Sequence, residues 1–387
     1  VPRYSVGKVT ALDMERRALE AAVWGIPIVS LDAIRRSLYR DARAQQGDIV
    51  YWSQPSDWKF AFRTSLALTR YVYVSINTRH GPAVLEVPPA TGAIVTGAVA
   101  DAWQAPLANV GVDGEDRGDG GRYLVLPPGY RGETPAGYRV IGSSTYNTYA
   151  LLRIIPSSAS DADVDRAIAL LQRTRVYPLS QATFPPRQRH LDLGTRWLAG
   201  SVPSDETFFE NLARMIDEEP VRDLVAIGHL KSLGFRTGQP FRPDTPTREV
   251  LSVAATQAHA SFMQCAMQGV RWWPDRQWTL SVIAGPRTGF TYMTGDRLEV
   301  DERAMLFLVG TSTPKAFGHT TSFTGALRGI VDERLATTRP TRLRMPTRYW
   351  AASLHDQETA WFLRDAPNLT ADRRITFFRF YSPRIAR

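Results

Sequence analysis

A run of short alternating segments, separated by glycine and proline turns, most constrains the fold of this chain. Between residues 66 and 155, apolar and polar residues alternate with the period of a strand, which sends successive side chains to opposite faces. Turns such as RHGP, PPATG and PPGYRG end these segments. This spacing is typical of an antiparallel β-sandwich or jelly roll and argues against alternating βαβ units. The expected strands are 66–75, 82–87, 93–100, 122–127, 137–142 and 146–155.

Helical patterns lie on both sides of this β-rich stretch. Two helices are expected near the start, one ending at Gly25 and Pro27 and the next ending at Gly47. Helical periodicity returns over residues 186–270, and strand patterns follow it. We therefore predict a β-rich α+β fold, in which two antiparallel β-sandwich or jelly-roll-like domains are joined by a helical segment. The predicted units are 1–185, 186–270 and 271–387.

Composition excludes several classes of protein. The chain has 387 residues, of which 43% are hydrophobic and 22% charged, as in globular proteins with substantial cores. No apolar run reaches the length of about 20 residues that a membrane-spanning helix needs. The net charge is +9, but the arginines are scattered and often lie beside acids, so no nucleic-acid-binding face is predicted. Cys265 is the single cysteine, so no internal disulfide is expected.

The segment TSLALTRYVYVS, residues 64–75, is the most unusual of the predicted strands. One face carries Leu66, Leu68, Arg70, Val72 and Val74. The opposite face carries Ala67, Thr69, Tyr71, Tyr73 and Ser75. Tyrosines further along, Tyr146 and Tyr149, could extend the second face. Aromatic rings with polar tips suit the wall of a ligand pocket and equally a sandwich core with hydroxyls at its edge, so both alternatives stay open.

An acid at the end of a predicted strand is a candidate for chemistry. Asp101 follows an apolar strand in the segment ADAWQ. A carboxylate placed there, near tyrosines, could act as a general base or orient a hydroxyl group. The alternative is a buried structural pair between Asp101 and Arg153, which lies at the end of YNTYALLR.

Several segments resemble known bacterial families. Four of them resemble the family called domain of unknown function 1254, namely ALEAAVWGIPIV, HGPAVLEVP, GGRYLVLPPGYRGETPAGYRVIGSSTYNTYALLR and DADVDRAIALLQ. TFFENLARMIDEEP and LGFRTGQPFRPD are similar to the segment that follows this domain in long members. Three further segments resemble the usual companion of this family, domain of unknown function 1214; they are VDERAMLFLVG, TRYWAASLHDQET and FFRFYSP. The resemblance implies an exported or cell-envelope protein, periplasmic or secreted, with two β-sandwich domains and no established activity.

The chain is a divergent member by this resemblance. The family commonly carries Asn-x-Asp-Thr-x-Tyr on the strand at 64–75. The matching positions here are Leu66, Leu68, Thr69 and Tyr71. The amide and the carboxylate are therefore replaced by leucines, whereas the threonine and the tyrosine remain. Asn77 stands where the family has an acid.

Metal and cofactor motifs are not found. His355 lies near Asp356 and Glu358, but in a strand it would point away from both acids, so no metal site is predicted there. The acidic loop at 111–121 could bind calcium, but its glycine and aspartate residues are equally typical of a solvated turn, which we favour. There is no G-x-S-x-G elbow, phosphate-binding loop or dinucleotide fingerprint, and no motif requires a cofactor.

The sequence thus predicts a protein that binds a small organic or carbohydrate-like ligand in a β-domain pocket and could hydrolyse it. The candidate catalytic residues are Asp101, Thr69 and Tyr71. The candidate ligand-binding residues are Tyr73, Tyr146, Tyr149, Arg153 and His355. A non-enzymatic structural or surface assembly protein is the main alternative, and a homo-oligomer is expected. A metal-dependent enzyme is a third alternative, against which the missing ligand motif counts.

Overall fold

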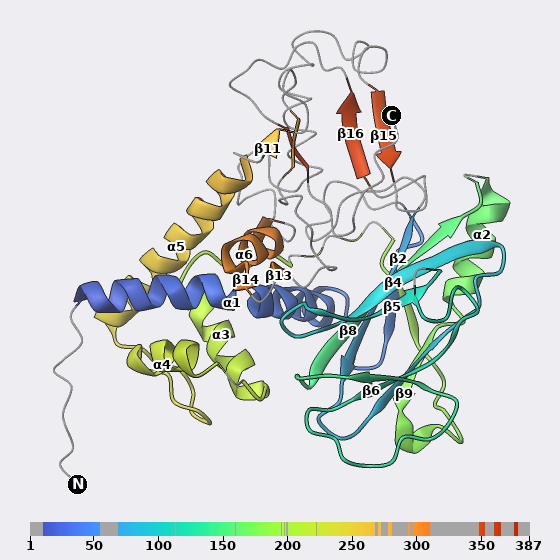
Figure 1. Ribbon diagram of the computed structural model, residues 1–387, viewed down its shortest axis with the longest axis horizontal. Coiled ribbons are helices and arrows are strands. Elements are labelled where there is room, and N and C mark those ends of the chain that lie inside the picture. Colours follow the sequence, from blue (N-terminus) through green and yellow to red (C-terminus); the bar gives the residue numbers. More distant parts are fainter. Residues whose placement is uncertain are drawn as a thin grey trace.

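The fold combines a β-sandwich with a group of helices (Figure 1). The computed structural model describes residues 11–54, 69–112, 114–158, 160–194, 196, 198, 200–221, 223–267, 270–271, 278–280, 293–294, 297–309, 348–352, 360–364 and 375–377. Over these residues the protein is α+β, with two larger mixed sheets and six helices. The second predicted sandwich falls largely outside the described residues and stays a prediction, as do the domain boundaries.

The two larger sheets contain ten strands of the described chain. The six-stranded sheet has the order β10 (His190–Asp192), β1 (Ile49–Tyr51), β2 (Arg70–Asn77), β8 (Asn147–Pro156), β4 (Ala93–Asp101) and β5 (Pro106–Gly111). The four-stranded sheet has the order β7 (Arg139–Gly142), β6 (Gly121–Leu126), β3 (Ala83–Val87) and β9 (Arg175–Pro178). The six strands expected from the alternation are present as β2, β3, β4, β6, β7 and β8, with shifted ends. The short strands β1, β5, β9 and β10 were not predicted.

The prediction of purely antiparallel sheets was wrong at two edges. β1 pairs with β10 in parallel, and β6 pairs with β7 in parallel, whereas the other neighbours in these two sheets are antiparallel. Parallel neighbours need a connection that returns the chain to the end at which it started. Residues 127–138 provide this connection between β6 and β7, and a much longer path joins β1 to β10.

One buried core lies between the two sheets. Val72, Val74 and Ile76 from β2 share it with Leu85 from β3 and Val125 from β6. These sheets are therefore the layers of a sandwich, and in Figure 1 β6 and β9 of the four-stranded sheet lie below β2, β4, β5 and β8 of the six-stranded sheet. The alternation predicted for β2 is confirmed over the described residues, but Leu66 and Leu68 lie outside them. Helix α2 (Asp161–Leu171), capped by Ser160, packs against β8 and contributes to the same core.

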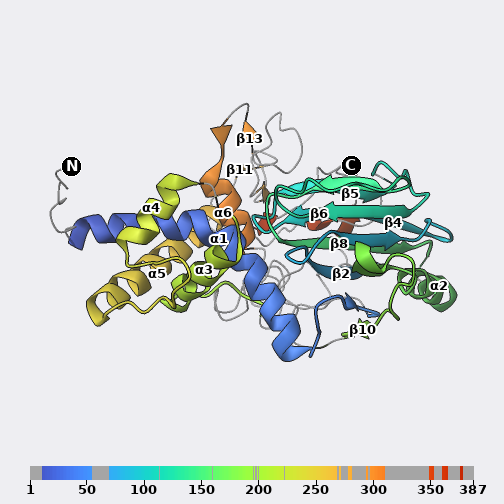
Figure 2. The ribbon, with the colours of Figure 1, turned by 90° about the horizontal axis from the view of Figure 1, so that it is seen from below.

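The first helix is longer than predicted. Helix α1 (Ala11–Asp41) continues through Gly25 and Pro27, where two separate helices were expected. Gly25 allows helix α3 (Thr207–Glu218) to approach, because a Cβ atom there would lie 2.7 Å from the Leu212 side chain. Proline inside a helix removes a hydrogen bond and bends the axis, and Figure 2 shows α1 changing direction along its length. Packing against α3 therefore overrides the local stop signal.

The other helices pack around α1. They are α3, α4 (Leu224–Ser232), α5 (Thr245–Met267) and α6 (Val300–Val309). α4 begins at Leu224, with Asp223 as its N-cap, within the segment 186–270 that was predicted to be helical. α6 belongs to the stretch predicted as a second β-domain, yet Ala304 and Leu308 are buried in the helical core. Among the described helices, none is both long and apolar enough to span a membrane.

Short strands complete the described part of the chain. They are β11 (Val270–Arg271), β12 (Trp278–Leu280), β13 (Met293–Thr294), β14 (Arg297–Leu298), β15 (Arg348–Ala352), β16 (Ala360–Arg364) and β17 (Ile375–Phe377). β12 pairs in parallel with β17, so segments about a hundred residues apart in the chain meet there. These strands occur where strand patterns were predicted to return.

Candidate functional site

The outer face of the six-stranded sheet carries most of the predicted site residues. On β2 and β8, every second side chain points away from the core between the sheets. The register places Tyr71 opposite Arg153, and Ser75 opposite Tyr149. On the other side of β8, Arg153 is opposite Thr96 of β4. We call this surface the tyrosine face, defined by Tyr71, Tyr73, Tyr149, Arg153 and Thr96. Thr69 immediately precedes β2 and belongs to the same side by alternation.

A buried guanidinium group lies at one end of the tyrosine face. The Arg153 side chain packs over the Tyr71 ring, with its guanidinium carbon 5.5 Å from the ring centroid, a cation–π contact. Arg153 is 6% exposed and Tyr71 is 2% exposed, and the neighbouring Thr69 and Thr96 are also buried. The structure thus brings together Tyr71 and Arg153, two residues that the sequence singled out. A guanidinium group beside hydroxyls can bind a carboxylate or a carbonyl oxygen.

Two stacked tyrosines form the middle of the tyrosine face. The rings of Tyr73 and Tyr149 lie 5.4 Å apart and are nearly parallel, at 16°. Tyr73 is packed in a core with Ile34 and Leu38 of α1, whereas Tyr149 is half-buried. The Tyr149 hydroxyl donates a hydrogen bond of 3.1 Å to Oε1 of Gln104. The second half of α1 therefore covers part of the face that the alternation predicted to be a pocket or a core.

Asp101 lies away from the arginine that was proposed as its partner. In the ladder between β4 and β8, Asp101 is opposite Thr148, five positions from Arg153. At about 3.3 Å per residue, the two positions are about 16 Å apart along the strand. The alternative of an Asp101–Arg153 pair is therefore wrong. The catalytic roles assigned to Asp101, Thr69 and Tyr71 stay predictions.

Asp101 holds the turn that joins β4 to β5. Its carboxylate accepts a hydrogen bond of 2.9 Å from the backbone N–H of Ala105 and one of 3.5 Å from the Ser144 hydroxyl. Burial raises the pKa of the Asp101 carboxyl above its ordinary value, although the hydrogen bonds and the charge of Arg303 act in the opposite direction. The geometry resembles that of a turn-forming aspartate.

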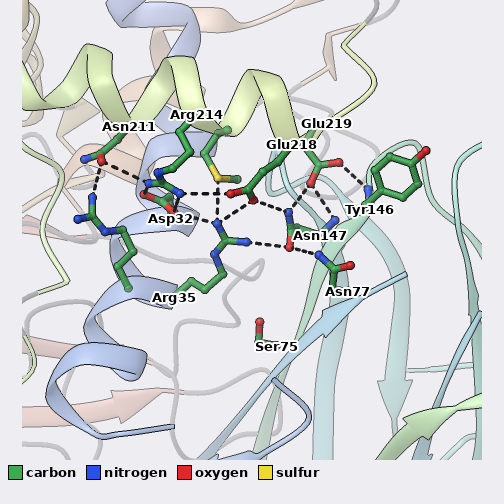
Figure 3. A network of polar contacts seen from close by, with 12 residues as sticks. Asp32, Arg35, Ser75, Asn77, Tyr146, Asn147, Asn211, Arg214, Glu218 and Glu219 are labelled. Carbon is green, nitrogen blue, oxygen red and sulfur yellow. Dashed lines mark hydrogen bonds and ion pairs between the residues drawn. The ribbon is translucent and has the colours of Figure 1, made fainter. Parts of the chain in front are cut away.

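A network of charged side chains lies where the helices meet the sandwich, beyond the other end of the tyrosine face (Figure 3). We call it the junction network. It consists of Asp32, Arg35, Asn77, Asn147, Arg214, Glu218 and Glu219.

The α1–α3 part of the junction network is made of ion pairs. Asp32 of α1 is fully buried and accepts hydrogen bonds from Arg35, at 3.1 Å, and from Arg214 of α3, at 3.0 Å. Arg35 also donates to Glu218 at 2.9 Å. Burial opposes the charge of Arg35, but its acidic neighbours raise its pKa further above the ordinary value. A buried charge of this kind is tolerated because it is paired and hydrogen-bonded.

Glu219 connects α3 to the beginning of β8. Its Oε1 accepts from the backbone N–H of Asn147 at 2.8 Å and from Asn147 Nδ2 at 2.7 Å, and its Oε2 accepts from the backbone N–H of Tyr146 at 2.5 Å. Oδ1 of Asn147 in turn accepts from Arg35 and Asn77. Burial raises the pKa of the Glu219 carboxyl, although the three N–H groups pull it down.

Tyr146 belongs to this junction and not to the tyrosine face. Its backbone is held by Glu219, and the guanidinium of Arg79 lies 5.0 Å from its ring centroid. Sequence reasoning missed Glu219, which is 72 residues from Asn147. The pair of acids before Pro220, within the predicted helical segment 186–270, was the one local signal that could have pointed to it. The ligand-binding role of Tyr146 stays a prediction.

The remaining candidates are placed as follows. His355 lies outside the described residues, as does Asp113 of the acidic loop. In that loop, the buried Asp116 accepts backbone hydrogen bonds from Gly111, at 2.7 Å, and from Gly120, at 3.1 Å. Its carboxylate therefore holds the turn together, which supports the turn interpretation. Within the described ranges, no three His, Cys, Asp or Glu side chains are grouped so that they could hold a metal ion.

Comparison with known proteins identifies one part of the chain. Residues 49–178 match the family model described as "Protein of unknown function (DUF1254)". The match covers the sandwich from β1 to β9 and confirms the resemblance to domain of unknown function 1254 for this part. The resemblance of the C-terminal part to domain of unknown function 1214 stays a prediction. The chain has no match among curated proteins.

Two solved structures show distant similarity. The VPA0106 protein from Vibrio parahaemolyticus is 14% identical, with a TM-score of 0.48 over 90% of this chain and 73% of that protein. An uncharacterized protein from Burkholderia cenocepacia is 10% identical, with a TM-score of 0.25 over 66% of this chain and 60% of that protein. At these values, neither similarity carries an argument about fold or function.

Proposed function

We propose that this chain, whose residues 49–178 match the DUF1254 family, binds a small organic or carbohydrate-like ligand through a carboxylate or carbonyl oxygen on the tyrosine face. The observation that supports the proposal most is the register of β2 and β8, which sets the buried Arg153 beside Tyr71. Thr96 of β4 lies opposite Arg153 on the other side of β8, and the buried Thr69 immediately precedes β2. A planar guanidinium among hydroxyls and aromatic rings suits an oxygen-rich anionic ligand.

We propose binding, and not hydrolysis, as the activity of this face. A general base must reach the proton that it removes, directly or through one water. Asp101, the predicted base, lies about 16 Å from Arg153 along the sheet at about 3.3 Å per residue. Because the face is buried, a ligand there would be enclosed, and we expect slow association and release.

The test is a thermal-shift titration with galacturonate and, as the neutral counterpart, galactose. A ligand that binds the folded state at about 100 times its Kd adds about 2.7 kcal/mol of stability. We expect galacturonate, but not galactose, to raise the Tm of the wild-type protein, and Arg153→Met to lose this response. Arg139→Met is the matched control, because Arg139 also packs over a tyrosine, Tyr123, in the other sheet. A wild-type protein that does not respond, or an Arg153→Met response equal to that of the wild type, contradicts the proposal.

We also propose that the protein is exported and that residues 271–387 form a companion domain like domain of unknown function 1214. Both ideas rest on the family resemblance of the segments quoted above. Fractionation of cells that produce the full-length natural protein tests the first idea, and finding the protein in the cytoplasm alone would contradict it. A structure of residues 271–387 without a β-sandwich would contradict the second.

A non-enzymatic assembly protein is the second candidate, because apolar side chains are exposed where α1 and α4 begin. Leu224 is 83% exposed and Val225 is 70% exposed, and Leu12 is also exposed. α1 and α4 pack against each other. Leu224 and Val225 are adjacent in the chain, and exposed apolar side chains that lie next to each other are typical of interfaces. Light scattering should then show an oligomer that dissociates in the Leu224→Gln/Val225→Gln variant; a monomeric wild type contradicts this candidate.

A further inference from the structure

We propose that Gln104 is a positioning residue, whose side-chain amide fixes the Tyr149 ring on the tyrosine face and ties that ring to the bend of α1. The effect of Gln104 on ligand binding rests on the proposed function. The structural part of the inference stands on contacts that do not depend on any ligand.

The amide of Gln104 bridges two elements far apart in the sequence. Oε1 accepts the hydrogen bond of 3.1 Å from the Tyr149 hydroxyl on β8, and Nε2 donates one of 2.8 Å to the backbone oxygen of Pro27 in α1. Gln104 itself is 6% exposed, so both ends of its amide are used inside the protein. A buried amide with both ends bonded orients its partners, because each would otherwise lose a hydrogen bond away from water.

The backbone at Gln104 suggests that its side chain is needed. Its φ is +62°, in the left-handed region that glycine enters freely and other residues rarely adopt. Asp101 holds the turn through its backbone. Its oxygen accepts a hydrogen bond of 3.0 Å from the N–H of Gln104, and its N–H donates one of 3.0 Å to the backbone oxygen of Ala105. Glycine would relieve the strain but could not make either side-chain contact. The strained glutamine is therefore best explained by its amide.

The turn also has anchors that do not involve the Gln104 side chain. Trp103 packs on Trp24 of α1, with ring centroids 4.6 Å apart and a 50° angle between the planes. Ala102 is fully buried in the helical core. Removing the Gln104 amide should therefore leave the turn docked on α1, while the Tyr149 hydroxyl loses its hydrogen bond to Gln104. Because Tyr149 stacks on Tyr73, its orientation is passed to the rest of the tyrosine face.

Tyrosine NMR on the full chain, labelled with ¹³C at the ring Cζ, tests the structural part. Tyr149→Phe and Tyr73→Phe identify the two signals. We expect Gln104→Met, which keeps the size but removes both hydrogen bonds, to move the signals of Tyr149 and Tyr73. Tyr123 and Tyr177 lie on the four-stranded sheet and serve as internal controls. A merely stabilising residue would leave these native-state signals in place, so unchanged Tyr149 and Tyr73 signals overturn the proposal.

Further variants keep the test decisive. If Gln104→Met does not fold, Gln104→Gly, which removes the backbone strain, decides the question by the same two signals. Gln104→Glu keeps the acceptor for Tyr149, so we expect its Tyr149 signal to stay near that of the wild type. A Gln104→Glu signal displaced as far as that of Gln104→Met overturns the proposed hydrogen bond.

The ligand-binding part uses galacturonate as the probe. We expect Gln104→Met to weaken its binding about fivefold, the effect of losing one neutral hydrogen bond. Unchanged affinity together with moved tyrosine signals overturns the link between Gln104 and the ligand. If the wild-type protein does not bind galacturonate at all, the proposed function fails, whereas the NMR signals still decide whether Gln104 positions Tyr149.

Discussion

The hydrogen bonds of Glu219 make Glu219→Gln the sharpest test of the junction network. The carboxylate accepts three N–H groups, two on Oε1 and one on Oε2. Glutamine has one acceptor oxygen, so if that oxygen keeps both bonds to Asn147, the new NH₂ group faces the N–H of Tyr146. A lost hydrogen bond to a charged group costs about 1.5–3 kcal/mol, and a buried donor left without an acceptor costs about 1–3 kcal/mol. The two costs overlap, because they concern the same donor.

A compensating effect reduces this loss. Burial raises the pKa of Glu219, which means that the charged form is disfavoured in the folded protein. A neutral amide avoids this desolvation cost. We therefore expect Glu219→Gln to lower the free energy of unfolding by about 2 kcal/mol, near the lower end of the range for a buried hydrogen bond to a charged group.

Urea unfolding followed by circular dichroism measures this change. The matched control is Glu210→Gln on the same helix, because Glu210 is exposed; we expect a change of about 0.5 kcal/mol or less. If Glu219→Gln unfolds at the same urea concentration as the control, the junction network does not hold α3 to β8, and the reasoning from its hydrogen bonds is refuted.

Other positions give independent tests. Burial raises the pKa of Asp101 in the folded state, so the contribution of Asp101 to stability is greatest at low pH and is lost as pH rises through the folded pKa. In urea unfolding from pH 4 to 8, the free energy of unfolding of Asp101→Asn should therefore rise relative to that of the wild type. A difference that stays constant with pH contradicts this. Gly97→Ala should lower the unfolding free energy by about 3 kcal/mol or more, because a Cβ atom there overlaps the Leu151 carbonyl oxygen. The control is Gly142→Ala, whose Cβ atom meets open space, and it should unfold at nearly the same urea concentration as the wild type. Asp116→Ala should cost about 2 kcal/mol in the same assay, since two backbone N–H groups lose their acceptor, and a wild-type midpoint would refute the holding role.

The faces of β2 could be predicted from its sequence, but its neighbours could not. Alternation assigns Val72 and Val74 to one side and Tyr71 and Tyr73 to the other, and the structure has this arrangement. Alternation has a period of two, so it carries no information about which residue lies opposite which. The pairing of Tyr71 with Arg153 is a matter of register and needed the structure.

Long-range packing explains the other differences. Pro27 has the local signature of a helix end, yet contacts between α1 and α3, which come from segments far apart in the chain, keep the helix going. Glu219 and Asn147 meet where α3 contacts the start of β8, and no periodic pattern in the sequence links these two positions. Residues that act through tertiary contacts of this kind leave almost no periodic signal in the sequence.

The pairing of β10 with β1 determines which fragments of this protein can be produced. β10 lies beyond residue 178, where the family match ends. Residues on both sides of β10 nevertheless bond to β1: the N–H of Ile49 donates to the backbone oxygen of Arg189 at 3.0 Å, and the N–H of Leu193 donates to the backbone oxygen of Tyr51 at 2.8 Å. A fragment cut to residues 49–178 would leave the outer edge of β1 without a neighbour and strip α1 from the tyrosine face. Unpaired strand edges template intermolecular pairing, so such a fragment should aggregate. Expression boundaries that include α1, β10 and the helices that pack on α1 should avoid this.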